Sequence, residues 1–392
     1  MHNETMSSRE RVVAALRHQV SDRVPIDLGS TWCSSTTIPF YEQLKKHFHC
    51  DAPTATMERI MQVSMIDEQI LQQLHVDTRC VCPNAPELER NQEVELGEGL
   101  YRDPWGIEWT KPPTSHYYDL HKSPLGGEIT LSDIMHHPWP EPYDPGYTRG
   151  LRERVAKMRT ETDCALVLNL SLWPLQCSQN VRGYVDWYMD VVSAPHLIEC
   201  MLDCITESML GPIETVTAAI GDLVDAIAVS DDIGHQDRLC MSPKMYRKIV
   251  KPRHARLAQA IKSRSDKPLV WHTCGCVYDI LDDLIEIGVD SLNPVQTTAR
   301  NMEAERLKHE YGGRLSFWGA IDTMQVLNNG TPEDVRLEVR HKIAALAPGG
   351  GYILNPIHNV QPDVPVENLL AMIDAALEYG RFPIEAEAKS QG

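Results

Sequence analysis

The sequence has too little positive charge to suit an anionic macromolecular partner. Its 392 residues contain 37 Lys and Arg against 55 Asp and Glu, which gives a formal net charge of −18. Proteins that bind nucleic acid or an anionic membrane surface carry an excess of basic residues. The composition therefore argues against both kinds of partner. It leaves a small-molecule substrate or a partner protein with a basic docking face.

Long apolar runs and an ordered set of cysteines are also missing. No apolar run approaches the roughly 20 residues that cross a membrane, and Met1–Ser8 lacks the charged and then apolar pattern of a signal peptide. The 11 cysteines are scattered without repeated spacings, as is usual in a reducing compartment. We therefore expect a cytoplasmic protein without a membrane-spanning segment.

The sequence does contain a regular alternation of short apolar runs with amphipathic helical segments. The apolar runs are typical of buried strands, and the segments between them have apolar residues at spacings of three and four. This alternation predicts a parallel sheet with helical crossovers. The eight predicted strands are residues 24–28, 77–82, 164–169, 225–230, 269–271, 290–294, 315–319 and 352–355.

Eight such strands favour a (β/α)8 TIM barrel of the α/β class. The alternative, an open doubly wound sheet, is less favoured because no Gly-x-Gly-x-x-Gly follows the first strand. A helix that begins with the capping-box sequence Ser7–Glu10 precedes that strand and predicts an N-terminal helical extension. No internal repeat or low-complexity segment divides the chain, so we expect residues 1–392 to form a single barrel domain.

Three further segments elaborate the N-terminal third. Residues 93–120 alternate in polarity and are rich in Gly and aromatic residues, which predicts a β-hairpin inserted beside the barrel. Residues 41–48 and 56–74 are predicted as helices.

A His-x-Cys pair follows the fifth predicted strand. His272 and Cys274 stand where the strand hands over to a helix, which is the end of a parallel barrel that carries active sites. Side chains two residues apart on an extended chain point the same way, so the imidazole and the thiolate can converge on one soft metal ion. Zinc is the first choice. The alternative is a buried Cys that packs as a small hydrophobe beside a hydrogen-bonded His.

Other polar residues follow neighbouring strands and are expected near this pair. His358, after the eighth strand, is the best candidate for a third metal ligand, since catalytic zinc usually has three protein ligands. Cys276 or an Asp is the alternative third ligand, and a surface-loop role is the alternative for His358. Asp231 and Asp232 follow the fourth strand and can act as acid or base, bind metal or orient a ligand, while one of them can instead cap the next helix.

Contacts to the substrate are predicted for residues on three strands. Asn169 and Asn293 stand at strand ends, and Trp271 precedes the His-x-Cys pair. Trp271, with Trp173 and Trp318, can wall a pocket for an aromatic substrate, although core packing is the alternative for at least one of the three.

Several stretches resemble the uroporphyrinogen decarboxylase superfamily, over about residues 7–383. The stretches that carry the resemblance are Arg9–Leu16, Asp22–Asp27, His272–Gly275, Gly288–Pro294, Phe317–Asp322 and Gly349–His358. The resemblance implies a (β/α)8 barrel, the fold that the alternation predicts independently.

The superfamily has two main branches. Its decarboxylases carry an arginine-rich loop near the first strand that grips the carboxylates of the substrate, whereas the loop here, Gly29–Ser35, has no arginine. The resemblance to the other branch, the corrinoid-dependent methyltransferases, implies zinc bound by a His-x-Cys pair and a later Cys. His272 and Cys274 match that pair, while His358 stands where the later Cys is expected.

These patterns lead to a first functional hypothesis. The chain is predicted to be a zinc-dependent methyltransferase that moves a methyl group between a small donor, such as a methoxylated aromatic compound, and the cobalt of a corrinoid (cobalamin) partner protein. Zinc would polarise the ether oxygen, and Asp231 or Asp232 would supply or relay a proton. Transfer in the opposite direction, to a thiolate or to tetrahydrofolate, fits the same residues.

Two alternatives compete with this hypothesis. The first is a cofactor-independent decarboxylase of a smaller acid that uses His358 and an Asp at the strand ends. The second is a metal-binding barrel retained only for interaction. The sequence leaves the oligomeric state open, with a homodimer among the alternatives.

Overall fold

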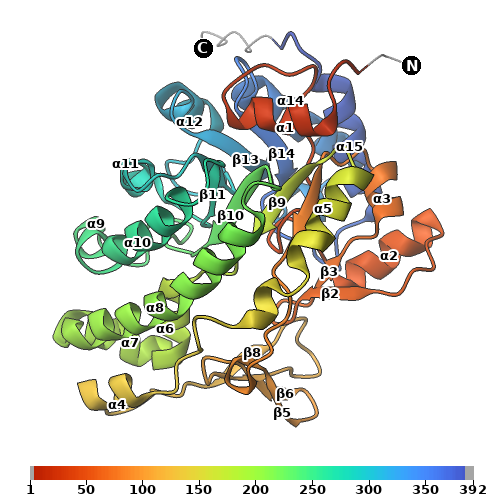
Figure 1. The fold of residues 1–392 in the computed structure, drawn as a ribbon. Coiled ribbons are helices and arrows are strands. Elements are labelled where there is room, and N and C mark those ends of the chain that lie inside the picture. The colour runs from red at the N-terminus through yellow and green to blue at the C-terminus, as the bar shows by residue number, and fades with distance from the viewer. Residues whose placement is uncertain (1–3, 385–392) are drawn as a thin grey trace.

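A curved sheet of seven parallel strands forms the centre of the protein (Figure 1). The computed structural model describes residues 4–384. The strands lie side by side in the order β14-β13-β12-β11-β10-β9-β4, so each strand neighbours the next along the chain. Their bounds are β4 Thr78–Val81, β9 Ala165–Asn169, β10 Ala226–Ser230, β11 Leu269–His272, β12 Ser291–Asn293, β13 Ser316–Ile321 and β14 Tyr352–Pro356.

The predicted first strand closes this sheet into a barrel. Ile26 forms a parallel bridge with Leu354 of β14, and the amide of Asp27 donates a 2.9 Å hydrogen bond to the carbonyl of Leu354. On the other side, the amide of Asp77, next to β4, donates to the carbonyl of Ile26 at 2.8 Å. All eight predicted strand positions therefore pair around one ring, and the predicted (β/α)8 TIM barrel is confirmed.

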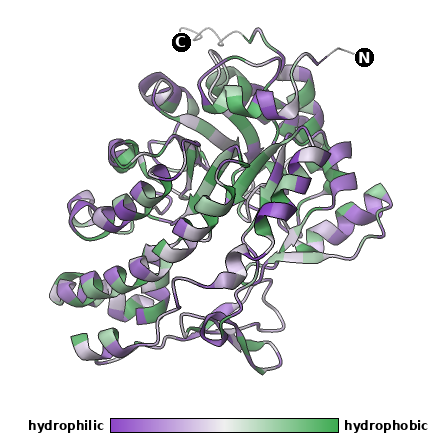
Figure 2. Ribbon diagram, viewed as in Figure 1, coloured by the Kyte–Doolittle hydropathy of each residue, from purple (hydrophilic) through white to green (hydrophobic). Residues whose placement is uncertain are grey.

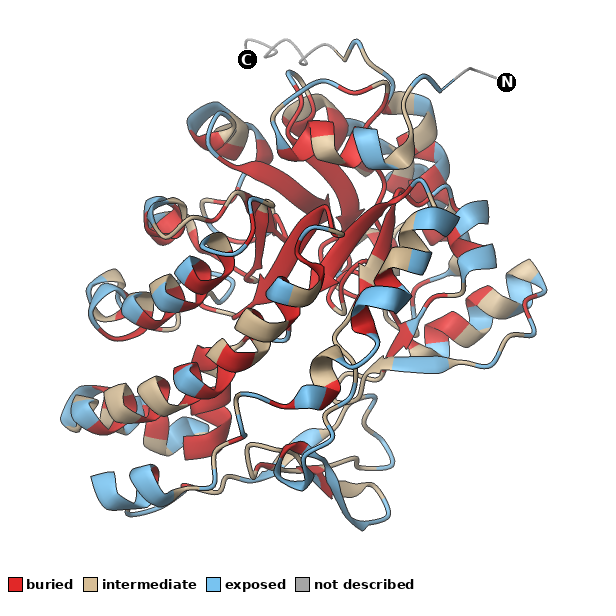
Figure 3. Cartoon of the chain, in the orientation of Figure 1, coloured by how far each residue is buried: buried red, intermediate tan, exposed pale blue. Residues whose placement is uncertain are grey.

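Helices cover the outer face of the barrel (Figure 1), and the strands between them are buried (Figure 3) and mostly apolar (Figure 2). The crossover helices carry apolar residues on the face that meets the sheet, which drives their packing. The longer helices are α1 Ser8–Leu16, α2 Ile38–Phe48, α5 Leu151–Glu161, α6 Pro174–Arg182, α7 Tyr184–Ser193, α8 Pro195–Ile220, α10 Lys251–Lys262, α12 Ala304–Tyr311, α14 Pro332–Leu346 and α15 Val366–Tyr379. The short ones are α3 Glu68–Gln73, α4 Leu131–His136, α9 Pro243–Met245, α11 Leu281–Glu286 and α13 Val326–Asn329.

One end of the barrel is plugged by the N-terminal helix α1. The predicted capping box is present, with the Ser7 side chain accepting from the amide of Glu10. Val12 and Leu16 of α1 pack into a separate apolar cluster with inward-facing strand residues such as Val270 and Ile353. The opposite end, at the carboxyl ends of the strands, is therefore the end at which a substrate can enter. Within residues 4–384, no helix has the length and apolar character needed to span a membrane.

A four-stranded antiparallel sheet lies at the end of the molecule opposite α1 (Figure 1). Its strands are β5 Val94–Gly97, β6 Leu100–Arg102, β7 Glu108–Thr110 and β8 Asp119–Lys122. The predicted inserted hairpin is its β5–β6 pair, and the segment continues through two more strands. This sheet stands beside the open end of the barrel and supplies part of the cavity described below.

A small three-stranded sheet occupies much of the segment predicted as a helix over residues 56–74. Its strands are β1 Thr36–Thr37, β2 Ala55–Glu58 and β3 Val63–Met65. The helix prediction is wrong here except for α3. The Glu58 carboxylate accepts hydrogen bonds from the amides of Ile60 and Met61, at 2.8 and 2.6 Å, and so turns the chain between β2 and β3. Ser64 of β3 then pairs with Thr36, a long-range contact that periodicity does not encode.

Candidate metal centre and active site

The alternation of side chains along β11 decides what faces the barrel interior. Val270 belongs to the interior cluster, so His272, two residues later, also points inward, at the carboxyl end of the strand. Trp271 points the other way. It is 2% exposed and packs against His254 of α10, with ring centroids 4.7 Å apart. The predicted substrate contact of Trp271 is therefore corrected: its side chain belongs to the outer core.

His272 is held in one orientation by Asn293 of β12. The Nδ1 atom of His272 lies 2.6 Å from the Oδ1 atom of Asn293, whose amide also donates to the carbonyl of Trp318 at 3.2 Å. Because Oδ1 can only accept, the proton sits on Nδ1 and the lone pair on Nε2 is left free. Burial lowers the pKa of His272 to about 4, so the ring is neutral. Asn293, predicted to contact substrate, instead fixes the tautomer of a candidate ligand.

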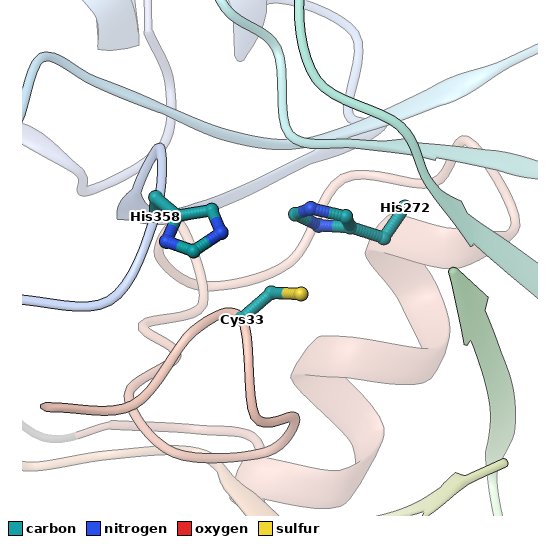
Figure 4. A group of neighbouring side chains, drawn as sticks. All are labelled: Cys33, His272 and His358. Atoms are coloured by element: carbon teal, nitrogen blue, oxygen red, sulfur yellow. The ribbon is translucent and has the colours of Figure 1, made fainter. Parts of the chain in front are cut away.

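His358, after β14, faces His272 across a short gap (Figure 4). The ring centroids are 5.7 Å apart, and the Nδ1 atom of His358 lies 2.6 Å from the Oδ1 atom of Asn359. The same reasoning leaves its Nε2 atom free. The two imidazoles thus offer unprotonated nitrogens to the same space.

A third donor, Cys33, comes from the loop after the first barrel strand. The ligand atoms of Cys33, His272 and His358 all lie within 4.8 Å of one another, and Figure 4 shows the Cys33 side chain below the two imidazoles. Cys33 is 2% exposed. These three residues come from parts of the sequence more than 80 residues apart, and the closed barrel brings them together.

The Cys33 loop is tightly fixed by hydrogen bonds. The amide of Gly29 donates to the carbonyl of Ser34 at 2.9 Å, and the hydroxyl of Ser35 donates to the carbonyl of Ser64 at 2.7 Å. Gly29 has φ of +83°, and a Cβ there would lie 3.1 Å from Cδ1 of Ile66, so the turn requires glycine. The position of the Cys33 sulfur is thus set by the loop before any ligand arrives.

A second group of donors shares His272. The ligand atoms of Asp232, His272 and Cys274 also lie within 4.8 Å of one another. The Cys274 sulfur is 3.5 Å from the Nε2 atom of His272, and Oδ1 of Asp232 is 4.0 Å from that nitrogen. The predicted ligands Cys274 and His358 therefore both lie close to His272. They belong to different donor groups, and His272 is the residue that the two groups share.

The neighbouring carboxylates Asp231 and Asp232 have different environments. Asp231 is fully buried, lies 2.9 Å from Nε2 of His254, and accepts hydrogen bonds from the amides of Leu175 and Gln176 at the start of α6. It caps that helix away from the open space, and this position favours the structural role over the predicted catalytic one. Burial raises the pKa of Asp231.

Asp232 faces the open space beside His272. Its Oδ1 atom accepts a 2.7 Å hydrogen bond from the amide of Cys274, and Oδ2 accepts from the side chain of Gln176 at 3.2 Å. Its side chain is 33% exposed. Of the two predicted carboxylates, Asp232 is therefore the one that can exchange a proton with a bound molecule.

Cys276, the alternative third ligand, turns away from this space. Its amide donates to the carbonyl of His235 at 2.7 Å, and its side chain lines another cavity beside Asp237 and Arg300. Among the residues that the structure describes, it belongs to neither donor group.

The donor chemistry fits a soft divalent metal ion such as zinc. Neutral imidazole nitrogens and thiolate sulfurs are the ligands that zinc prefers, and each His carries a hydrogen bond on its other nitrogen. Burial, followed by nearby negative groups, raises the pKa of the thiols of Cys33 and Cys274. A divalent cation reverses that effect because it stabilises the thiolate.

A cavity of about 190 Å³ opens directly beside this centre. Its described lining residues include no Lys or Arg. They are Trp32, Glu58, Ile60, Met61, Trp109, Ser171, Trp173, Gln176, Asn180, Asp232, His272 and His358. Burial raises the pKa of Glu58. The cavity is therefore lined largely by aromatic side chains, and its charged lining residues, Glu58 and Asp232, are acidic.

An adjoining cavity of about 420 Å³ shares several of these walls and extends toward the antiparallel sheet. Asn169, one of the predicted substrate contacts, lines this second space next to Cys82. Trp173 lines both cavities. Trp318, in contrast, is buried inside the barrel, where its Nε1 donates to Asp27 at 2.9 Å.

Sequence reasoning missed Cys33, Trp32, Trp109 and Glu58. Trp32 and Cys33 stand in the polar loop after the first predicted strand, and that position alone was a signal, since such loops build barrel active sites. Trp109 and Glu58 come from the two small sheets, and nothing local to either residue indicates that it reaches the barrel mouth.

Comparison with known proteins places this architecture among related chains. A family model described as uroporphyrinogen decarboxylase matches residues 174–379. A methylcobamide:CoM methyltransferase, MtaA, of Methanosarcina barkeri is 25% identical over 200 residues, which are 51% of this chain and 53% of the relative. A uroporphyrinogen decarboxylase of Alkalilimnicola ehrlichii is 26% identical over 277 residues, which are 67% of this chain and 72% of the relative.

The MtaA match spans only about half the length of that relative. Among solved structures, a methyltransferase from Methanosarcina mazei superposes with a TM-score of 0.65 at 18% identity and covers 95% of this chain and 99% of its own. That superposition supports the barrel fold over nearly the full chain.

Proposed function

The chain belongs to the uroporphyrinogen decarboxylase family, and we propose that it is a corrinoid-dependent methyltransferase with a zinc centre. The single observation that carries the proposal is the set of soft donors around His272, at the carboxyl end of the barrel and open to an aromatic cavity. The family model is described as uroporphyrinogen decarboxylase, and the relatives of this chain include a methylcobamide:CoM methyltransferase. The soft donor set favours methyl transfer over decarboxylation. The protein is proposed to be cytoplasmic and to work with a separate corrinoid protein.

The proposed methyl donor is a small methoxylated aromatic compound. Trp32, Trp109 and Trp173 line the cavity and provide aromatic surface for a planar ring. In the proposed transfer, the methyl C–O bond would break with its electron pair left on the oxygen, and a Co–C bond would form to cob(I)alamin on the partner, which acts as the co-substrate. Zinc, when bound by His272, Cys274 and His358, supplies Lewis-acid stabilisation of the negative charge on that oxygen.

The residues of this chain have separate roles in the proposed reaction. Asn293 and Asn359 orient the two imidazoles, so that each ring presents its free nitrogen. Asp232 holds the Cys274 backbone in place through the amide hydrogen bond. It also holds or delivers the proton that the aryloxide takes up. The indoles exclude water from the reacting atoms, which strengthens the electrostatic interactions there.

The decarboxylase alternative has less support from the cavity. A carboxylate substrate needs cationic partners, and the described lining residues of the cavity beside His272 include neither Lys nor Arg. Asp232 and Glu58 would instead repel a second negative charge.

The proposal is tested by methyl transfer to free cob(I)alamin. Zinc-loaded protein is mixed with cob(I)alamin and methoxybenzene derivatives, and methylcobalamin is followed by its absorbance. We expect product with wild-type protein, and at least about a 100-fold lower rate with His272→Ala or after chelation. A zinc-loaded protein that transfers no methyl group, and a metal-free protein that releases CO2 from a small acid, would together establish the alternative.

A further inference from the structure

The two thiols near His272 approach it as members of two different donor groups. Cys33 is grouped with His272 and His358, and Cys274 is grouped with His272 and Asp232. The Nδ1 atom of His272 lies beside Asn293, so the Nε2 atom is the one free to bind a metal, and the Cys274 sulfur is 3.5 Å from it. Each thiol therefore lies near a nitrogen of His272, although Cys33 and Cys274 do not share one donor group.

We propose that Cys33 is a metal ligand and supplies a second thiolate beside that of Cys274. This inference rests on the proposed zinc centre, and it names a ligand from the first barrel loop that the His-x-Cys motif does not contain. The resulting donors are two imidazoles and two thiolates, a set typical of zinc, and the oxygen of the proposed methyl donor would bind as a fifth ligand. Two thiolates also balance the charge of a divalent ion. This balance matters because a net charge is costly in the buried barrel interior, away from water.

The surroundings of Cys33 offer a hydrogen-bond donor to a metal-bound sulfur. The side chain of Ser230, at the end of β10, is close to that of Cys33. Ser230 is 3% exposed, and its hydroxyl has no hydrogen-bond partner in the described part of the chain. A hydroxyl left free in this position can donate to a metal-bound sulfur, as a neighbouring hydrogen bond commonly does in metal sites.

Asp232 is less available than Cys33 as the additional donor. Both of its oxygens already accept hydrogen bonds, from the amide of Cys274 and from Gln176. Its side chain also reaches the cavity, where a proton can be exchanged. The Cys33 sulfur, by contrast, is buried on a loop whose backbone is fixed by Gly29 and Ser35.

The test counts sulfur ligands directly. Full-length protein is loaded with zinc, and its zinc K-edge X-ray absorption gives the number of sulfur neighbours. We expect two for wild type, one for Cys33→Ser and one for Cys274→Ser. The matched control is Cys50→Ser, a buried cysteine outside the site, which keeps two. Chelator competition should show that Cys33→Ser weakens zinc binding by at least about tenfold.

One sulfur neighbour in wild type, or two in Cys33→Ser, overturns the proposal. Because the wild-type count is itself decisive, a Cys33 variant that fails to fold leaves the test intact. The outcome is also separate from methyl transfer. A protein with two sulfur ligands and no activity on any donor refutes the proposed reaction but not the ligand assignment. An active protein with one sulfur ligand refutes the assignment of Cys33 but not the proposed reaction.

Discussion

At the scale of single residues, the candidate centre depends on groups that orient the ligands as well as on the ligands. Asn293 shows this, because its side-chain oxygen accepts the Nδ1 proton of His272 and its amide is tied to the carbonyl of Trp318. The imidazole is therefore held in the tautomer that a metal requires before the metal binds.

Replacing Asn293 tests this orienting role. Asn293→Leu should weaken zinc binding by about 10–100-fold, because the ring loses its acceptor and its preferred tautomer. Asn293→Asp keeps an oxygen at the same place and should retain most of the affinity. Chelator competition measures both variants. Equal affinity in Asn293→Leu and wild type would show that the hydrogen bond has no role in metal binding.

The adjacent carboxylates offer a matched pair of substitutions. Asp231→Ala leaves the amides of Leu175 and Gln176 and the buried His254 without their acceptor, so the free energy of unfolding should fall by about 3 kcal/mol or more. Asp232→Ala removes the proton-exchanging group and should lower kcat by about 100-fold or more with a smaller stability loss. Thermal melts and methyl-transfer rates separate the two effects. The reverse pattern would mean that the assigned roles are exchanged.

The position of a residue after a strand was predictable from the sequence, but the side of the strand on which its side chain lies was not. His272, Cys274, His358 and Asp232 follow strands, and the barrel brings such positions to one end. Trp271 could not be oriented from the sequence, since the direction of a strand side chain depends on which alternate residues face the interior.

At the scale of elements, the sequence predicted that the β5–β8 segment contains antiparallel strands. It did not predict that this sheet contacts the mouth of the barrel. Its β6–β7 turn contains Asp103, which accepts hydrogen bonds from the amides of Trp105 and Ile107 and from the indole of Trp109, at 2.9, 3.0 and 2.8 Å. Trp109 in turn lines the cavity beside His272. The turn therefore couples the inserted sheet to the candidate active site.

The pH dependence of stability should report on this turn. Burial raises the pKa of Asp103 from 3.8 to about 7. Between these values the folded protein binds the proton more tightly than the unfolded chain, so stability falls as pH rises, by at most about 1.4 kcal/mol per pH unit. The contribution is fully present below pH 4 and absent above pH 7.

Asp103→Asn removes this titration and should flatten the stability profile between pH 4 and 7. The difference is measured as the denaturant midpoint of each protein at several pH values. Asp119→Asn, on an exposed position of β8, is the control and should follow wild type. A wild-type slope that Asp103→Asn leaves unchanged would assign the effect to other carboxylates.

The helix predicted over residues 56–74 fails to form because of contacts between elements. The turn made by Glu58 and the pairing of Ser64 with Thr36 are tertiary contacts, and they outweigh the local helical spacing. Glu58 also reaches the cavity, so the element that was hardest to predict supplies a residue of the candidate site.

At the scale of the whole molecule, the barrel was predictable because the alternation of a short apolar strand with an amphipathic helix is repeated along the chain. Each short apolar run becomes a buried strand beside the one before it, and the ring closes through Ile26 and Leu354. Cys33 could not be paired with His272 and His358 from the sequence, because that contact exists only once the first and last strands meet.

The charge of the whole molecule bears on the proposed methyl donor. The net charge is −18, and Glu58 and Asp232 line a cavity whose described walls contain no Lys or Arg. The negative potential should therefore disfavour an anionic donor over an uncharged one of the same shape.

We expect an uncharged methoxybenzene derivative to bind at least about tenfold more tightly than its carboxylate analogue, since one uncompensated repulsion of about 1.4 kcal/mol suffices. Quenching of tryptophan fluorescence measures both dissociation constants, because Trp32, Trp109 and Trp173 line the cavity. The matched variant Glu58→Gln should narrow the difference, and added salt should narrow it further. The measurement uses metal-free protein, so that a zinc ion at His272 and His358 cannot hold the carboxylate. Tighter binding of the carboxylate under these conditions would contradict the placement of the donor in this cavity.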